Sequence, residues 1–364
     1  MAYTKQPKYF DLMEELEQKI LSGTYRAGDK LPSENELSRD YQVSRQTVRK
    51  ALEILEEKGL TYARHGSGTF VSGMSHAFMK SKNIAVITTY LSDYIFPRVI
   101  QGVDRVLTEH GYSILLKNTR NSRSMEAQIL TELLKKEIDG LIIEPSKSQI
   151  FCRHMNLYEE LDAYQIPYVF IQGSYSLMKH KPHVLMDDCK GGYLVTRHLI
   201  EQGRKDILGI FKADDYQGQE RHKGYVKALQ ENGIPYDPER VIWYYTEDRK
   251  SHPYMEISQC LLERDKSFFD AVVCYNDQIA IDVIRALEEA GLECPKDVAV
   301  TGYDDSYLAQ TCRIPLTTIA HPQEKLGQMA AELLLKLIRG DNISEENTQI
   351  IIDPELVVRK STTE

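Results

Sequence analysis

The residues from Tyr41 to Leu52 carry side chains suited to reading nucleic acid. Arg45, Arg49 and Lys50 lie in this stretch, which contains no acidic residue. Arginine can donate two hydrogen bonds to guanine, and an amide side chain can pair in the same way with adenine. Ser44 is suited to cap a helix that starts beside Arg45, where backbone amides and the helix dipole favour a phosphate. The stretch therefore predicts a helix that reads base edges in a DNA major groove.

Three helical patterns and a short hairpin are expected to position these side chains. Apolar residues recur at helical spacing over residues 10–20, and Ser33 with Glu36 predicts a capping box at the start of a second helix. Residues 60–64 and 69–71 are predicted to form two strands joined by a glycine-rich tip. A three-helix packing module whose polar face only meets water is the alternative. The helix order, the tight turn, the hairpin and the acid-free stretch together favour a winged helix-turn-helix.

Composition limits the possible classes of protein. The 364 residues are 42% hydrophobic and 27% charged, which predicts more than one folded domain. The net charge of −9 argues against a general nucleic-acid binder, and residues 1–72 hold 11 basic and 11 acidic side chains. A local basic face on a neutral scaffold can still bind phosphates. Because the chain shows no secretory signal and no apolar run of about 18–20 residues, we expect a cytoplasmic protein without a membrane partner. Without a C-x-x-C pair, its cysteines are expected to be reduced and not to bind a metal.

From residue 83 onward, short apolar runs alternate with amphipathic segments. Repeated strand-helix-strand units predict an α/β fold with parallel sheets covered by helices. About 280 residues exceed one sheet, so we expect two doubly wound lobes. The predicted domains are therefore residues 1–72, a linker at 73–82, and an effector-binding and dimerisation domain at 83–364. The expected strands are 84–89, 112–117, 140–143, 168–171, 184–186, 207–211, 241–244, 271–274 and 298–302.

Polar and aromatic residues directly follow several of these strands. In such sheets ligands bind at the carboxyl ends of the strands, where the strand order reverses. Carboxylates, amides and guanidinium groups can each hold paired hydroxyl groups, and aromatic rings can cover the apolar face of a sugar. We therefore expect a small polyol or sugar site, although the same side chains are also common helix caps and turn residues. The candidates are Asp93, Tyr94, Ile95, Phe96, Glu144, Gln172, Tyr216 to Arg221, Asn276, Asp277 and Asp304.

Residues 5–72 resemble the winged-helix head of the GntR family of bacterial regulators. The resemblance lies in residues 28–37 (GDKLPSENEL), 43–52 (VSRQTVRKAL) and 66–71 (GSGTFV). It implies that equivalent positions contact an operator: one before the first helix, Glu34 or Asn35 at the second helix, four in the third helix and two in the wing. With the cap residue, the expected DNA-binding set is Lys8, Glu34, Asn35, Ser44, Arg45, Gln46, Thr47, Arg49, His65 and Gly66.

Residues 83–360 resemble the LacI/GalR regulators and the type I periplasmic sugar-binding proteins. The matching segments are 218–225 (GQERHKGY), 271–280 (AVVCYNDQIA), 298–305 (VAVTGYDD) and 315–319 (PLTTI). The resemblance implies sugar contacts from Arg221, Asp277, Asp93 or Phe96, and His321, a position where an amide is more usual. A GntR-type head on a LacI-type domain is similar to the arabinose-responsive repressors of Gram-positive bacteria. This implies L-arabinose as the effector.

The expected function is a sequence-specific repressor of sugar-use genes that leaves its operator when it binds the sugar. A two-fold homodimer is expected, because it places two reading helices in successive major grooves. A regulator that answers to another sugar or metabolite stays open, and a sugar-modifying enzyme is a further alternative. The sequence has no G-x-x-x-x-G-K-[ST] or G-x-S-x-G motif, so we expect no catalytic residue and no cofactor.

Overall fold

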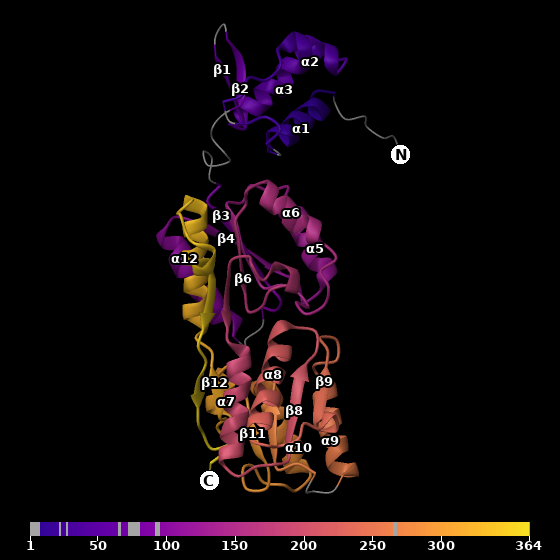
Figure 1. The fold of residues 1–364 in the computed structure, drawn as a ribbon, viewed down its shortest axis with the longest axis vertical. Helices are drawn as coiled ribbons and strands as arrows, with labels where there is room; N and C mark the ends of the chain where they lie inside the picture. The colour runs from indigo at the N-terminus through magenta and orange to yellow at the C-terminus, as the bar shows by residue number, and fades with distance from the viewer. Residues whose placement is uncertain are drawn as a thin grey trace. The chain divides into compact units, whose positions relative to one another are not determined.

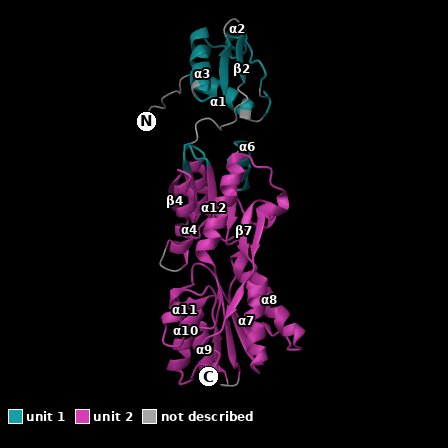
Figure 2. Cartoon of the chain, turned by 90° about the vertical axis from the view of Figure 1, so that its left-hand side faces the viewer, with its two compact units in different colours: residues 1–83, 134–139, 155–167 teal, residues 84–133, 140–154, 168–364 magenta. Residues whose placement is uncertain are grey.

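The computed structural model describes residues 8–21, 23–26, 28–64, 67–71, 81–91, 95–264 and 268–363 (Figure 1). The chain divides into two compact units (Figure 2). Residues 1–83, 134–139 and 155–167 form one unit, and residues 84–133, 140–154 and 168–364 form the other. The predicted boundary at residue 72 and the predicted linker stay predictions, and residues 72–80 lie outside the described part.

Three helices and a hairpin form the N-terminal head. They are α1 (Lys8–Leu21), α2 (Glu34–Asp40), α3 (Arg45–Glu57), β1 (Thr61–Arg64) and β2 (Gly68–Val71), with β1 and β2 antiparallel. Leu16, Val48 and Leu55 are fully buried in one shared core. This is the predicted winged helix-turn-helix.

The caps predicted for the second and third helices are present. Ser33 Oγ accepts a hydrogen bond from the backbone N–H of Glu36, and the Glu36 carboxylate accepts one from the backbone N–H of Ser33. Ser44 Oγ accepts from the backbone N–H of Thr47 at 3.2 Å. These local bonds fix where α2 and α3 begin, and therefore which residues occupy the first turn of α3.

Strands and helices alternate through the rest of the chain. In order they are β3 (Asn83–Thr88), α4 (Phe96–Glu109), β4 (Ser113–Asn118), α5 (Arg123–Leu133), β5 (Gly140–Ile143), α6 (Met155–Ala163), β6 (Tyr168–Ile171), β7 (His183–Met186), α7 (Asp188–Glu201), β8 (Ile207–Lys212), α8 (Tyr216–Glu231), β9 (Val241–Tyr244), α9 (His252–Glu263), β10 (Ala271–Cys274), α10 (Asp277–Glu289), β11 (Ala299–Thr301), α11 (Tyr307–Thr311), β12 (Thr318–Ala320), α12 (Gln323–Arg339), β13 (Gln349–Ile352) and β14 (Glu355–Val357). Short 3-10 turns cover 176–178, 238–240 and 345–348. The predicted α/β class is confirmed.

Two sheets build two lobes. The six-stranded sheet of the first lobe has the order β13-β7-β6-β5-β3-β4, and the four-stranded sheet of the second lobe has the order β11-β10-β8-β9. The pairs β3–β5, β5–β6, β6–β7, β7–β13, β8–β9, β8–β10 and β10–β11 are parallel. Strands β12 and β14 form a separate antiparallel pair. In the sequence, β12 follows the last strand of the second lobe and β14 follows the last strand of the first lobe. The chain passes from one lobe to the other three times, after β7, after β12 and after β13.

Helices α7 and α8 approach closely through two glycines. A Cβ atom at Gly192 would overlap the carbonyl oxygen of Arg221, and one at Gly224 would overlap the carbonyl oxygen of Cys189. This close packing fixes the turn of α8 that carries the Arg221 side chain.

Two further observations concern membrane spans and cysteines. In the part that the structure describes, no helix combines the length and apolar character that a bilayer crossing requires, and all six cysteines are free thiols.

Candidate DNA-reading helix and effector cavity

The first turns of α3 present the predicted base-reading side chains to solvent. Arg45, Gln46 and Arg49 are exposed and Thr47 is half-buried, while Val48 turns into the core. Lys8 and Asn35 are also exposed, at the starts of α1 and α2. His65 and Gly66 lie outside the described residues, and all of these DNA contacts stay predictions.

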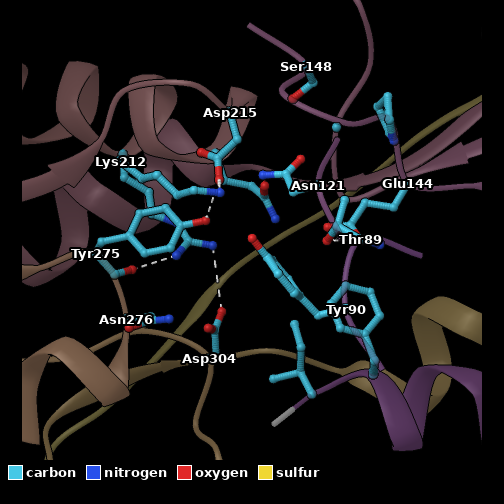
Figure 3. A pocket seen from close by; sticks show the side chains of 16 residues that line it. Thr89, Tyr90, Asn121, Glu144, Ser148, Lys212, Asp215, Tyr275, Asn276 and Asp304 are labelled. Carbon is cyan, nitrogen blue, oxygen red and sulfur yellow. Dashed lines mark hydrogen bonds and ion pairs between the residues drawn. The ribbon is translucent and has the colours of Figure 1, made fainter. Parts of the chain in front are cut away.

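A cavity of about 100 Å³ lies between the two lobes of the second unit (Figure 3). Both lobes contribute to it, mostly through residues at the ends of their strands. Such a volume is well below the ~300–1,000 Å³ of clefts that bury drug-sized molecules. The lining residues are Thr89, Tyr90, Ile95, Phe96, Asn121, Glu144, Pro145, Ser148, Gly173, Lys212, Asp215, Gln217, Arg221, Tyr275, Asn276 and Asp304.

Seven of the candidates named from the sequence line this cavity: Ile95, Phe96, Glu144, Gln217, Arg221, Asn276 and Asp304. Asp93 and Tyr94 lie outside the described residues. The lining also includes residues that the sequence analysis missed. Thr89 and Tyr90 directly follow β3, Lys212 ends β8, and Tyr275 follows β10, so a stricter use of the strand-end rule would have found them.

Gln172, Asp277 and His321, which were also predicted to contact the effector, are buried outside the lining. Gln172 Oε1 lies 3.0 Å from His321 Nε2. Asp277 Oδ1 accepts a hydrogen bond from Thr318 Oγ1 at 2.6 Å, and Oδ2 accepts from the backbone N–H of Ser306 at 2.8 Å. Their sugar contacts stay predictions, and the structure gives Asp277 a clear role in joining α10 to neighbouring backbone.

The guanidinium of Arg221 is locked in place on the second lobe. Its Nε donates to Asp188 Oδ1 at 2.8 Å and its Nη1 donates to the carbonyl oxygen of Tyr275 at 2.6 Å. Nη2 lies 3.6 Å from Asp304 Oδ1, and the group stacks 3.5 Å from the ring centre of Tyr303. Burial raises the pKa of Asp188 to about 6, although Arg221 opposes this shift. A preorganised guanidinium of this kind offers its remaining donor directions to oxygen atoms of a ligand.

Charged groups from the two lobes line opposite walls. Glu144 Oε2 accepts from the backbone N–H and the hydroxyl of Thr89, at 2.7 and 2.5 Å. Burial raises the pKa of Glu144 to about 7. On the second lobe, Lys212 Nζ donates to Asp215 Oδ2 at 2.9 Å, and the Tyr275 hydroxyl donates to the same oxygen at 2.7 Å. The two cations of the lining are paired within the protein, Lys212 with Asp215 and Arg221 with Asp188, and Glu144 bonds to the neutral Thr89, so the arrangement suits a neutral polar ligand.

Several buried polar atoms around the cavity have no hydrogen-bond partner among the described protein groups. On the cavity wall these are the Tyr90 hydroxyl and Asp304 Oδ1, and behind it Gln172 Nε2 and His321 Nδ1. Figure 3 shows the Tyr90 ring directed into the cavity. Leaving such a group unsatisfied costs ~1–3 kcal/mol. A ligand rich in hydroxyl groups can donate to one of these atoms and accept from the next.

The backbone around the cavity adopts unusual conformations. Asn121, Gln172 and Asp304 have φ values of 54°, 64° and 98°, in the region that normally favours glycine. Such conformations are characteristic of sites where the protein holds a side chain in a required direction.

A buried polar cluster fixes the loop of residues 144–150 in the first lobe. The Glu126 carboxylate accepts from the backbone N–H of Ser146 at 2.5 Å, from His154 at 2.8 Å and from the Tyr175 hydroxyl at 2.8 Å. Burial alone would lower the pKa of His154, but hydrogen bonds to Cys152 and Glu126 outweigh it and raise this pKa to about 9. The loop that carries Glu144 is therefore held by a buried ion pair.

The same loop reaches across to the second lobe. Lys147 forms ion pairs with Glu247 and, at 3.6 Å, with Asp214. The Ser148 hydroxyl accepts from the backbone N–H of Tyr216 at 2.9 Å. These bonds join the lobes beside the cavity.

Comparison with known proteins agrees with a DNA-reading head and a ligand-binding domain. Residues 8–71 match the model of the bacterial regulatory proteins of the gntR family, and residues 196–362 match the periplasmic binding protein-like domain. The transcriptional regulator CelR, solved in complex with cellobiose, superposes with a TM-score of 0.69 at 25% identity, over 88% of this chain and 92% of that one. The fold and the site thus define a transcription regulator with a DNA-binding head and a sugar-sensing type of domain.

Full-length relatives narrow the class. Arabinose metabolism transcriptional repressors from Halalkalibacterium halodurans and Geobacillus stearothermophilus are each 40% identical to the chain. The alignments cover 98% of this chain and 97% and 98% of the two relatives. The chain belongs to this family of arabinose metabolism transcriptional repressors. Because these relatives are regulators, the predicted repressor function is confirmed over the enzyme alternative. The family implies operator DNA and a sugar effector as partners.

Proposed function

We propose that the chain represses genes of arabinose use as a homodimer, and that L-arabinose bound between the lobes releases it from the operator. The observation that carries the proposal is the small cavity, with buried polar atoms that lack hydrogen-bond partners among the described residues, in a chain that resembles arabinose repressors over nearly its full length.

The chemistry of the cavity supports a monosaccharide. A pentose offers several hydroxyl groups, each of which donates and accepts. Asp304 Oδ1 is an acceptor, the Tyr90 hydroxyl is a donor or acceptor, and Arg221 is a donor, so adjacent hydroxyl groups can satisfy all three. The rings of Tyr90, Phe96 and Tyr275 in the lining supply apolar surface for the C–H face of the sugar.

Release follows from linkage between two equilibria. L-arabinose stabilises the closed pair of lobes, and that state is less suited to DNA binding. The coupling required for repression and release is typically ~1–3 kcal/mol, and it acts in both directions, so operator DNA must weaken arabinose binding by the same factor. In a homodimer a change in one lobe alters how two reading helices match half-sites about 34 Å apart.

The test is a titration of labelled DNA. The full-length chain is first used to select duplexes from a randomised library, and binding of the selected duplex is then measured by fluorescence anisotropy. L-arabinose should weaken this binding at least about fivefold, whereas D-arabinose and D-xylose should not. Release by every pentose would overturn the assignment of L-arabinose, and absence of duplex binding would overturn the regulatory function.

Two variants separate the DNA site from the sugar site. Arg45→Ala should weaken operator binding by ~1–3 kcal/mol and relax base preference, while L-arabinose binding is retained. Arg221→Met should weaken L-arabinose binding and retain operator binding, because it removes the buried guanidinium from the cavity and leaves the residues of the head unchanged. If Arg221→Met binds L-arabinose normally, the cavity is not the effector site.

A further inference from the structure

The two arginines of α3 are held differently. Arg49 Nε donates to Glu34 Oε1 at 3.2 Å, and Arg49 Nη2 donates to Glu34 Oε2 at 3.0 Å. The Glu34 carboxylate of α2 therefore accepts two hydrogen bonds from one side of the Arg49 guanidinium of α3. Arg45, one turn earlier on α3, has no ion-pair partner among the residues that the structure describes.

The geometry of the guanidinium group explains how Arg49 can bind Glu34 and a base at the same time. The group has two edges that can make paired hydrogen bonds, one through Nε and Nη2 and the other through Nη1 and Nη2. Glu34 occupies the first edge of Arg49. The second edge makes no hydrogen bond to another residue that the structure describes, and the Arg49 side chain is 66% exposed. That edge matches the N7 and O6 acceptors of guanine.

Glu34 is itself anchored. It is the first residue of α2, directly after the cap Ser33, whose reciprocal bonds with Glu36 fix this turn. Leu37, one turn further along α2, is 1% exposed in the head core. The carboxylate therefore projects from a rigid element, and its direction is set by the same bonds that start the helix.

We propose that Glu34 is a positioning residue for DNA reading, which aims the free edge of Arg49 at one base pair and does not itself contact the operator. The inference rests on the proposed function. It replaces the operator contact that the family resemblance implied for Glu34. A carboxylate at a DNA-facing surface repels phosphates and weakens binding to all sequences. In this role the repulsion is useful, because non-specific binding falls while the fixed arginine raises preference for the correct base.

The experiment compares base preference in four full-length variants: Arg49→Ala, Glu34→Gln, the double variant and Glu53→Gln. Glu53 is the matched control, because it is an exposed acid on α3 that pairs with Lys50 at 3.4 Å and makes no hydrogen bond to Arg49. Each protein is titrated with the duplex that the unmodified chain selects and with all its single-base substitutions. Thermal unfolding of each variant establishes that the head is folded.

Arg49→Ala should lose preference at one base pair by about tenfold or more. In Glu34→Gln, the affinity ratio between the correct and the substituted base at that position should fall about twofold to fivefold, the effect expected when an exposed ion pair is lost. This variant should also bind unrelated duplexes more tightly. The double variant should lose no more preference than Arg49→Ala, because Glu34 acts through Arg49. Glu53→Gln should leave base preference unchanged.

Two outcomes would overturn the inference while leaving the regulator intact. If Glu34→Gln alters binding to all duplexes equally, the carboxylate acts only through its charge. If it loses preference at a base pair that Arg49→Ala still reads, Glu34 contacts a base itself. By contrast, failure of the unmodified chain to select any duplex would overturn the proposed function and this inference together.

Discussion

Replacing Tyr90 with phenylalanine tests the cavity with the loss of a single oxygen atom. The Tyr90 hydroxyl is buried on the cavity wall without a hydrogen-bond partner among the described protein groups. The ring itself is held by the Arg249 guanidinium, 4.3 Å from its centre, and phenylalanine keeps that contact. The substitution therefore removes only the group that we assign to the sugar.

The structure sets the size and sign of two effects. With sugar bound, the variant loses one hydrogen bond, whose net contribution is ~0.5–1.5 kcal/mol, so the Kd for L-arabinose should rise about twofold to twelvefold. Without sugar, thermal stability should not fall, because the hydroxyl contributes no bond to the protein. Relief from burying an unsatisfied group raises stability if the free lobes stay closed.

Calorimetric titration gives the Kd, and thermal unfolding with and without L-arabinose gives the stability. Tyr245→Phe is the matched control, because Tyr245 is 51% exposed and does not line the cavity. An unchanged Kd in Tyr90→Phe would refute the role of the hydroxyl in binding. A large loss of stability without sugar would show that the hydroxyl serves the protein's own structure.

Three further predictions test other parts of the molecule. Lys147→Met removes the ion pairs that join the lobes, so L-arabinose binding should weaken by ~0.5–1 kcal/mol in calorimetry; Lys117→Met, which removes an ion pair to Glu132, is the control and should bind normally. Burial raises the pKa of Glu144 from 4.5 to about 7, so the folded lobe binds this proton more tightly than the unfolded chain. Its contribution to stability is complete below about pH 4.5 and is lost as the pH rises through about 7, and Glu144→Gln should flatten this part of the profile of Tm against pH. Leu16→Ala opens a cavity in the head core and should cost ~2–5 kcal/mol there; operator binding should fall while calorimetry shows normal L-arabinose binding, and a parallel loss of both would contradict independent folding of the head.

Local chemistry made the head predictable from the sequence. The bonds of Ser33, Glu36 and Ser44 connect residues three positions apart, so the starts of α2 and α3 can be recognised from residue type and spacing. The ion pair of Glu34 with Arg49 could not be predicted in this way. It spans two helices, and its geometry depends on how these pack.

The cavity was predicted only in part, because its walls combine local and non-local features. Strand ends predicted Glu144 and Asn276, which line it. Arg221 lines it from the second turn of α8, which begins at Tyr216. Asn121 was missed because it follows an edge strand in a turn with positive φ. Strands β12, β13 and β14 are three or four residues long and give little periodicity to detect.

The late position of β13 and β14 in the chain has a consequence for synthesis. Strand β13 completes the sheet of the first lobe beside β7, and Ser361 bonds to the backbone of Val300 and Pro315 in the second. Both lobes therefore need segments that are synthesised after the rest of their sheets. The core of the head is built from residues 12–71. All of its members are therefore synthesised before either lobe is complete, and a nascent polypeptide can carry a DNA reader before it is able to sense sugar.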